Sequence, residues 1–296
     1  KFCSVFMHAA LAFLVLLPAT AFAQQWPTKP VRIIVPFPPG QGADFVGRLL
    51  AERLTPALGQ QVVVENRPGA GSMIGTEYVA KAPADGYTLL IGGTSAMVIN
   101  PHLYSKLGYD TLRDFAPISN IASLPLMICV KSSFPAHAIQ DLIKLAKRRP
   151  GEITYGSSGN GSTHHLAQAM FTSAAGIQLT HVPYKGSTAS MADLIGGQIA
   201  MLADTMPAVL PFVRAGTIRA LGVTSIKRSP FFPDVPTLDE QGLKGAEVGI
   251  WHGLYAPKGT PKPVIDKLVS ALQEALKDDA VRQRFTDLGA VTFPMS

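Results

Sequence analysis

Short apolar runs alternate with amphipathic segments along most of the 296-residue chain. The run at 31–36 is rich in valine and isoleucine, which predicts a strand, and the segment at 43–58 spaces its apolar residues like one helix face that ends at Gly59. Further strands are expected at 61–65, 87–92, 153–157, 179–183, 199–203 and 218–224, and further helices at 72–81, 138–149, 162–175, 187–195, 263–277 and 279–288. Strands that alternate with helices build a mostly parallel sheet, so the sequence predicts the α/β class.

Two extended apolar stretches, 121–130 and 248–256, do not follow this alternation. We interpret them as crossings between two lobes, because the chain is long enough for two domains of ordinary size. The first lobe is then discontinuous, at 24–122 and 249–296, and the second lobe occupies 123–248.

The first segment has the pattern of an export signal. Lys1 gives a positive start, an apolar run follows at 9–17, and Ala21-Phe22-Ala23 is a small-residue cleavage site. A membrane anchor is the alternative, but the run is shorter than the roughly 20 residues of a spanning helix and Pro18 interrupts it. We expect residues 1–23 to be removed and the protein to be periplasmic.

Cysteine content and charge add little chemistry. With residues 1–23 removed, Cys129 stands alone, so no intramolecular disulfide can form, and its apolar neighbours indicate a packing residue rather than a catalytic thiol. The net charge is +6, but the one basic cluster, 144–149, ends a predicted helix, where cations offset the helix dipole. No aromatic residues are interleaved with it, so we expect no nucleic-acid partner.

A proline- and glycine-bearing loop at 36–44 separates the first strand from the first helix. A loop that opens a helix leaves backbone N–H groups unpaired at the positive end of the helix dipole, which attracts an anion. The alternative is a tight turn with Asp44 complementing the dipole from the first helical turn. Both interpretations stay open on this loop alone.

A second loop, at 156–164, also lies between a strand and a helix, in the other predicted lobe, and is rich in serine and glycine. Two such helix starts facing each other would suit a carboxylate. Neither loop contains Arg or Lys, so we expect backbone dipoles and hydroxyls to hold a modestly charged ligand, with Lys185 as the nearest cation.

At this point the sequence resembles the substrate-binding receptors of tripartite tricarboxylate transporters, often called the Bug family. The resemblance spans nearly the whole chain after residue 24, in order. Besides the loop from Pro36 to Asp44, it rests on Trp26-Pro27-Thr28-Lys29-Pro30-Val31-Arg32, Glu65-Asn66-Arg67-Pro68-Gly69-Ala70-Gly71, Ala84-Asp85-Gly86-Tyr87-Thr88-Leu89, Val182-Pro183-Tyr184-Lys185-Gly186, Asp234-Val235-Pro236-Thr237, Trp251-His252-Gly253-Leu254 and Ala256-Pro257-Lys258-Gly259-Thr260-Pro261.

The resemblance implies a two-lobed, periplasmic-binding-protein-like (type II) architecture with a ligand cleft between the lobes. It implies a monomeric receptor, without enzymatic activity, cofactor or metal, that delivers a small carboxylate ligand to the membrane permease subunits of a tripartite transporter. A membrane sensor protein is the alternative partner. The ligand-binding residues implied by the family motifs and the loops are Phe37, Gly40, Gly42, Ala43, Asp44, Thr94, Ser95, Ser157, Ser158, Gly159, Gly161, Ser162, Thr163, His164, Tyr184 and Asp204.

Two departures from the family pattern bear on this expectation. Relatives often carry Gly-Gly-Gly-Thr-Asp in the first loop, where this chain has Gln41 and Ala43 in place of a glycine and a hydroxyl residue, so the ligand cannot be copied from a relative. The family also continues past Leu288-Gly289-Ala290 with a strand and a helix. We therefore expect either that the sequence is cut short or that the first lobe exposes apolar surface.

Three other functions fit single motifs. Residues 69–75 resemble a dinucleotide-binding loop, but the third glycine is one residue late. A serine hydrolase could use Ser157, Ser158 or Ser162 with His164 or His165 and Asp204, although no Gly-x-Ser-x-Gly elbow is present. A metal site could use His164, His165 and His181, but adjacent histidines point to different faces of a helix.

Overall fold

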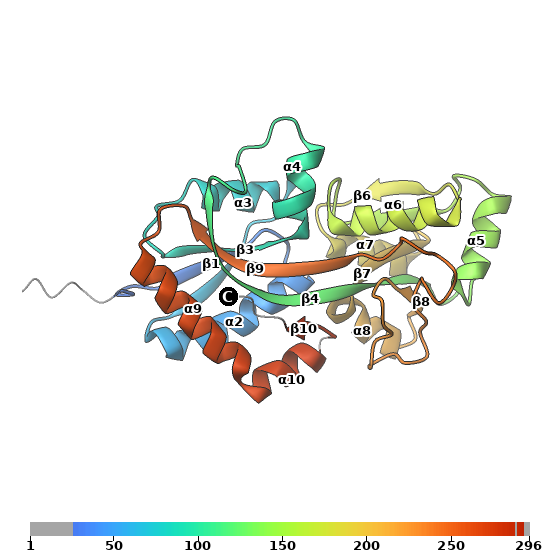
Figure 1. Cartoon of the computed structure of the whole chain (residues 1–296). Coiled ribbons are helices and arrows are strands. Elements are labelled where there is room, and N and C mark those ends of the chain that lie inside the picture. The colour runs from blue at the N-terminus through green and yellow to red at the C-terminus, as the bar shows by residue number, and fades with distance from the viewer. Residues whose placement is uncertain (1–25, 288, 293–296) are drawn as a thin grey trace, which may run out of the picture.

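The computed structural model describes residues 26–287 and 289–292, and it confirms the α/β class and the two-lobed architecture (Figure 1). The predicted export signal, 1–23, lies outside the described residues. Within the described part of the chain, no helix is long and apolar enough to cross a membrane.

The first lobe is built on a sheet in the order β2-β1-β3-β9-β4. β1 pairs in parallel with β2 and β3, whereas β9 pairs antiparallel with β3. Its strands are β1 (Val31–Val35), β2 (Val62–Asn66), β3 (Thr88–Gly93) and part of β9 (Gly249–Pro257) and β4 (Phe115–Lys131). Its main helices are α2 (Gly42–Leu58), α3 (Met73–Ala80), α9 (Lys262–Lys277) and α10 (Asp279–Asp287).

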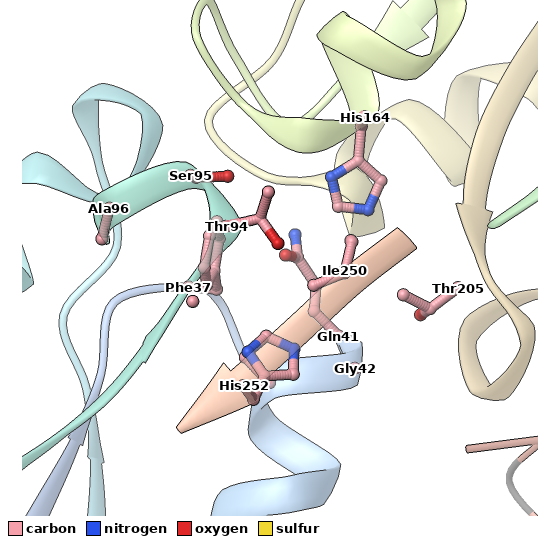
Figure 2. Close-up of a pocket in the computed structure, with 12 residues that line it drawn as sticks. Phe37, Gln41, Gly42, Thr94, Ser95, Ala96, His164, Thr205, Ile250 and His252 are labelled. Carbon is pink, nitrogen blue, oxygen red and sulfur yellow. The ribbon is translucent and has the colours of Figure 1, made fainter. Parts of the chain in front are cut away.

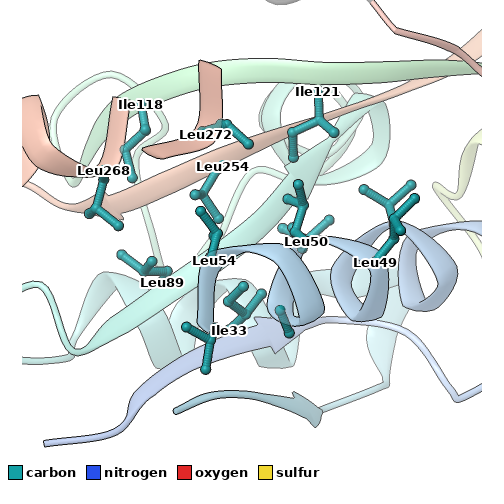
Figure 3. Packing of buried hydrophobic residues seen from close by; sticks show 14 of the residues in the cluster. Ile33, Leu49, Leu50, Leu54, Leu89, Ile118, Ile121, Leu254, Leu268 and Leu272 are labelled. Carbon is teal, nitrogen blue, oxygen red and sulfur yellow. The ribbon is translucent and has the colours of Figure 1, made fainter. Parts of the chain in front are cut away.

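The core of this lobe lies between the sheet and helices α2 and α9 (Figure 3). α9 buries Leu268 and Leu272, which stand one turn apart, against α2 residues such as Leu50 and Leu54. This packing brings a helix from the end of the chain onto the start of the sheet, which fixes the N-terminus of α2 at the edge of the first lobe.

β4 and β9 run side by side through both lobes (Figure 1). β4 pairs with β9 as far as Pro125 and then, from Leu126, with β7 (Met201–Thr205). The predicted crossing at 121–130 is therefore a strand, but the strand begins earlier, at Phe115. Irregular pairing between Pro117 and Ser119, and again between Asn120 and Ala122, breaks the apolar pattern there, which is why the sequence did not indicate it.

The second lobe continues the sheet in the order β4-β7-β5-β6, with β8 also paired to β4. Apolar clusters cover the sheet, and Cys129 is fully buried in one of them, as predicted. The remaining elements are β5 (Thr154–Ser157), β6 (Thr180–Pro183), β7 (Met201–Thr205), β8 (Ile218–Val223), α5 (Ile139–Arg148), α6 (Thr163–Ala175), α7 (Ser187–Gly196) and α8 (Met206–Arg214).

Some elements were not predicted from the sequence. Helix α8 was not predicted because it contains Pro207 and Pro211. Proline is well tolerated in the first turn of a helix, where Pro207 lies. The predicted helix 72–81 begins one residue later, at Met73, because Ser72 has a positive φ of 84° and belongs to the preceding 3-10 turn. The other additions are η1 (Ala70–Ser72), the π-turn η2 (Ser95–Ile99), α4 (Asn100–Leu103) and β10 (Val291–Thr292).

Candidate functional site

A small cavity lies where the two lobes meet, at the ends of several strands and at the starts of two helices (Figure 2). The β1–α2 loop, the end of β3, the start of α6, the end of β7 and the crossing strand β9 all contribute to it. Its lining consists of Phe37, Gln41, Gly42, Ala43, Gly93, Thr94, Ser95, Ala96, His164, Thr205, Ile250 and His252.

The cavity is nearly filled by its own side chains. About 20 Å³ remains in which the centre of a water molecule can lie, which is room for about one water. A larger ligand requires the lobes to separate on entry, so the structure represents a closed form.

The start of α2 provides the first predicted anion contact. Asp44 and Phe45 donate their backbone N–H groups to the carbonyl of Gln41, but the N–H groups of Gly42 and Ala43 have no partner in the described part of the chain. Both residues line the cavity, at the positive end of a 17-residue helix. Two unpaired donors in line with a helix dipole can hold one carboxylate.

Asp44 holds the loop in place and does not line this cavity. Its carboxylate accepts hydrogen bonds from the backbone N–H of Gly40 at 3.0 Å, the side chain of Arg48 at 2.9 Å and the side chain of Asn66 at 2.9 Å. Burial opposes ionisation of Asp44, but these contacts outweigh it and lower its pKa. Asp44 therefore acts on a ligand through the shape of the loop.

In the second predicted loop, most hydroxyl groups already form hydrogen bonds within the protein. Ser157 Oγ lies 2.7 Å from His181 Nε2, and Ser162 Oγ accepts from the backbone N–H of His165 and donates to the carbonyl of Gly159. These bonds shape the turn and cap α6. The loop therefore offers a ligand fewer donors than its composition indicates.

Hydrogen bonds of this loop cross between the lobes, and in one of them the Tyr104 hydroxyl donates to the backbone carbonyl of Asn160 at 3.1 Å. The backbone N–H of Thr163, at the start of α6, donates to Ser95 Oγ at 3.0 Å, and the two hydroxyl oxygens are also 3.0 Å apart. Ser95 lines the cavity and follows β3. In the closed form, Ser95 therefore accepts the hydrogen bond from the N-terminus of α6 that the sequence assigned to a ligand.

Ser158, His164 and Asp204 form a buried hydrogen-bonded chain. Ser158 Oγ bonds to His164 Nδ1, and His164 Nε2 lies 2.9 Å from Asp204 Oδ1. A hydrolytic triad has the opposite arrangement, with serine on Nε2 and aspartate on Nδ1. Ser158 is only 4% exposed and does not line the cavity. These hydrogen bonds fix the position of the His164 ring, which borders the cavity.

The remaining predicted residues lie around the cavity rather than in its lining. Gly159 and Gly161 take positive φ values of 115° and 75° in the turn before α6. Tyr184 donates to Asp193 at 2.6 Å, and burial together with this carboxylate raises its pKa to about 12. Gly40 and Asp204 border a neighbouring cavity against α7 and α8.

Gln41 and His252 are two of the lining residues that the sequence did not assign to the site. They are 2% and 3% exposed, and neither Gln41 Nε2 nor either ring nitrogen of His252 has a hydrogen-bond partner within the described residues. Burial, and then the proximity of His164, lower the pKa of His252 to about 4. The backbone of Gly92, which lies near the ring but makes no hydrogen bond of normal geometry with it, acts in the opposite direction. His252 is therefore neutral near pH 7.

The lining residues include no Arg, Lys, Asp or Glu. Among the described residues, no group of three His, Cys, Asp or Glu side chains could hold a metal ion. The glycines of the 69–75 motif pack closely instead: a Cβ added at Gly71 would lie 2.5 Å from the carbonyl oxygen of Asn160, and one at Gly75 would lie 2.7 Å from that of Arg67. This geometry favours close packing over a dinucleotide site.

Three solved structures are similar to the whole described fold. The periplasmic binding protein BugD is 42% identical, with a TM-score of 0.87, over 90% of this chain and 89% of that chain. A Rhodopseudomonas palustris protein solved with adipate is 39% identical, with a TM-score of 0.88, over 90% and 89%. MatC from the same organism, solved with bound malate, is 32% identical, with a TM-score of 0.85, over 90% of both chains.

These similarities agree with the family resemblance of the sequence motifs. The family model described as the tripartite tricarboxylate transporter family receptor matches residues 46–296, which is most of the chain. Together with the two lobes and the cavity between them, this match shows that the chain belongs to the tripartite tricarboxylate transporter receptor family.

Proposed function

We propose that this protein is a periplasmic receptor that binds one small carboxylate and delivers it to the permease subunits of a tripartite transporter. The observation that carries the proposal is the pair of unpaired backbone N–H groups, on Gly42 and Ala43, that line the closed cavity at the start of α2. Adipate and malate are carboxylates bound by relatives with the same fold.

The proposal includes the bounds of the two lobes. We assign 24–122 with 249–296 to the first lobe and 123–248 to the second, because β4 exchanges β9 for β7 as its partner between Pro125 and Leu126. The protein acts as a monomer after loss of residues 1–23. A membrane sensor is the alternative recipient of the bound receptor.

Binding, rather than hydrolysis, fits the Ser158–His164–Asp204 chain. Its serine is buried and bonded to the wrong ring nitrogen for general-base activation. Release of a product from an ester or amide of a bound acid by the purified protein would instead support the hydrolase alternative.

A thermal-shift screen of the purified protein tests the proposal. The panel contains mono-, di- and tricarboxylates, aromatic acids and amino acids, each with the matching amide. A carboxylate present at about 100 times its dissociation constant stabilises the fold by about 2.7 kcal/mol. We expect at least one acid to raise the melting temperature and its amide to have no effect. A cooperative melt that no acid shifts would contradict the proposal.

A variant locates the contact. In Ala43→Pro the helix keeps its shape but loses one N–H, and proline already occupies the equivalent second position of α8 and α9, as Pro207 and Pro263. Loss of a hydrogen bond to a charged group costs about 1.5–3 kcal/mol, so affinity should fall at least tenfold. Unchanged affinity with an unchanged melting temperature would remove the α2 start from the site.

A further inference from the structure

Gln41 and His252 present two buried, unpaired polar groups to the same cavity (Figure 2). Gln41 belongs to the loop before α2, whereas His252 belongs to the crossing strand β9. A buried polar group without a partner is unfavourable by about 1–3 kcal/mol, so two of them at one site indicate groups that a ligand completes.

The kind of ligand group follows from hydrogen-bond chemistry. The Gln41 amide nitrogen can only donate. A neutral imidazole donates through one nitrogen and accepts through the other, and no donor in the described part of the chain reaches either nitrogen of His252. An ionised carboxylate oxygen only accepts, so it can satisfy Gln41 but not the bare nitrogen of His252.

A hydroxyl group satisfies both residues at once, because its proton can go to the imidazole nitrogen while its oxygen accepts from the amide. An ammonium group could also donate to His252, but it has no acceptor role toward Gln41 and would need a carboxylate beside it. Asp204 bonds His164 and Thr205 through Oδ1. Its Oδ2 has no partner within the described residues, but Asp204 borders the neighbouring cavity against α7 and α8 and does not line this one.

We propose that Gln41 and His252 select a hydroxycarboxylate, with the carboxylate held at the start of α2 and the hydroxyl placed between the Gln41 amide and the His252 ring. This inference rests on the proposed carboxylate receptor and names its ligand class. It assigns ligand selection to Gln41, one of the two positions where this sequence departs from the usual first loop, and to a residue of the crossing strand.

The test compares matched acids of two to five carbons by calorimetry. Each set contains a hydroxy acid, the acid without the hydroxyl and the amino acid, such as malate, succinate and aspartate, or lactate, propionate and alanine. In the best set we expect the hydroxy acid to bind at least tenfold more tightly than its two analogues. Equal or tighter binding of the analogue without the hydroxyl would overturn the inference, whereas binding of no acid at all would count against the carboxylate receptor itself.

Two variants show whether these residues cause the preference. His252→Phe keeps a ring of similar size but has no nitrogen, and Gln41→Met keeps the length of the side chain but has no amide. In each variant we expect the advantage of the hydroxy acid to shrink to within about threefold. Gln41→Met changes only a loop, so it decides the question if the β9 variant does not fold, and an undiminished advantage in it would refute the assignment.

The pH profile separates hydroxyl recognition from capture of a second carboxylate by a protonated ring. Among the described residues, His164 is the one titratable group that acts on the pKa of His252. With a neutral ring, the advantage of the hydroxy acid should be constant between about pH 6 and pH 8. An affinity for dicarboxylates that rises steadily toward the acid end would mean that His252 binds as a cation, which contradicts hydroxyl recognition.

Discussion

Closure of the lobes can be perturbed at Gly71 without touching the cavity. Gly71 has a φ of 61°, and a Cβ added there would lie 2.5 Å from the carbonyl oxygen of Asn160, which belongs to the opposite lobe. Real Cβ atoms do not approach oxygen closer than 3.0 Å, so in Gly71→Ala the two segments must move apart. The Ser95–Thr163 bond lies in the same interface and would be lost or stretched.

Gly59→Ala is the matched control, because Gly59 also has a left-handed φ, of 70°, but has nothing within 4 Å of an added Cβ. A left-handed non-glycine residue costs roughly 1–2 kcal/mol, so both variants should lose about that much unfolding free energy in urea. Only Gly71→Ala should bind its carboxylate at least tenfold more weakly, and it should show a smaller ligand-induced compaction in solution scattering. Equal affinities of the two variants would refute this account of closure.

Three further predictions concern stability. Leu268→Ala, in the fully buried stripe of α9, should lower the unfolding free energy by about 2–5 kcal/mol, whereas Leu112→Ala, at a side chain that is 88% exposed, should change it by less than about 0.5 kcal/mol. Asp204→Asn removes a charged acceptor from His164 and should cost about 1–3 kcal/mol in urea unfolding, and no measurable change would contradict a structural role of that bond. The folded pKa of His252 is about 4, below its ordinary value of 6.5, so its contribution to stability is complete above pH 6.5 and is lost as pH falls toward 4. Between about pH 7.5 and pH 5.5 it accounts for about 1 kcal/mol, and His252→Phe should remove that part of the slope.

Periodicity predicted the fold well where each element carries its own apolar pattern. Strand β1 and helix α2 were expected within a residue or two of their bounds, because β1 is a nearly continuous buried run and the buried positions of α2 recur at helical spacing. It failed where tertiary contacts replace the pattern. α8 forms despite Pro211, and the first part of β4 forms despite two irregularities in its pairing.

The candidate site was harder to predict because its partners are distant in sequence. The sequence of a serine-rich loop before a helix does not show whether its hydroxyl groups bind a ligand or form hydrogen bonds within the protein. Here Ser157 meets His181, 24 residues away, and Thr163 meets Ser95, 68 residues away. The sequence identified both loops but could not show that the second loop was already satisfied, nor that Gln41 and His252 were not.

The two lobes differ in whether their cavity-lining polar groups have hydrogen-bond partners, and we therefore expect them to contribute differently to binding. Among the residues that line the cavity, the groups without partners lie on the first lobe and on its crossing strand: the N–H groups of Gly42 and Ala43, the amide of Gln41 and the ring of His252. Ser187 Oγ and Asp204 Oδ2, on the second lobe, also lack partners within the described residues, but they border the neighbouring cavity. The second lobe faces them with a loop whose hydroxyls are bonded internally and with Thr163, which bonds to Ser95 on closing. A ligand therefore gains most of its direct contacts by settling on the open first lobe. Closure then adds contacts between the lobes, which is why Gly71→Ala should weaken binding although Gly71 does not line the cavity.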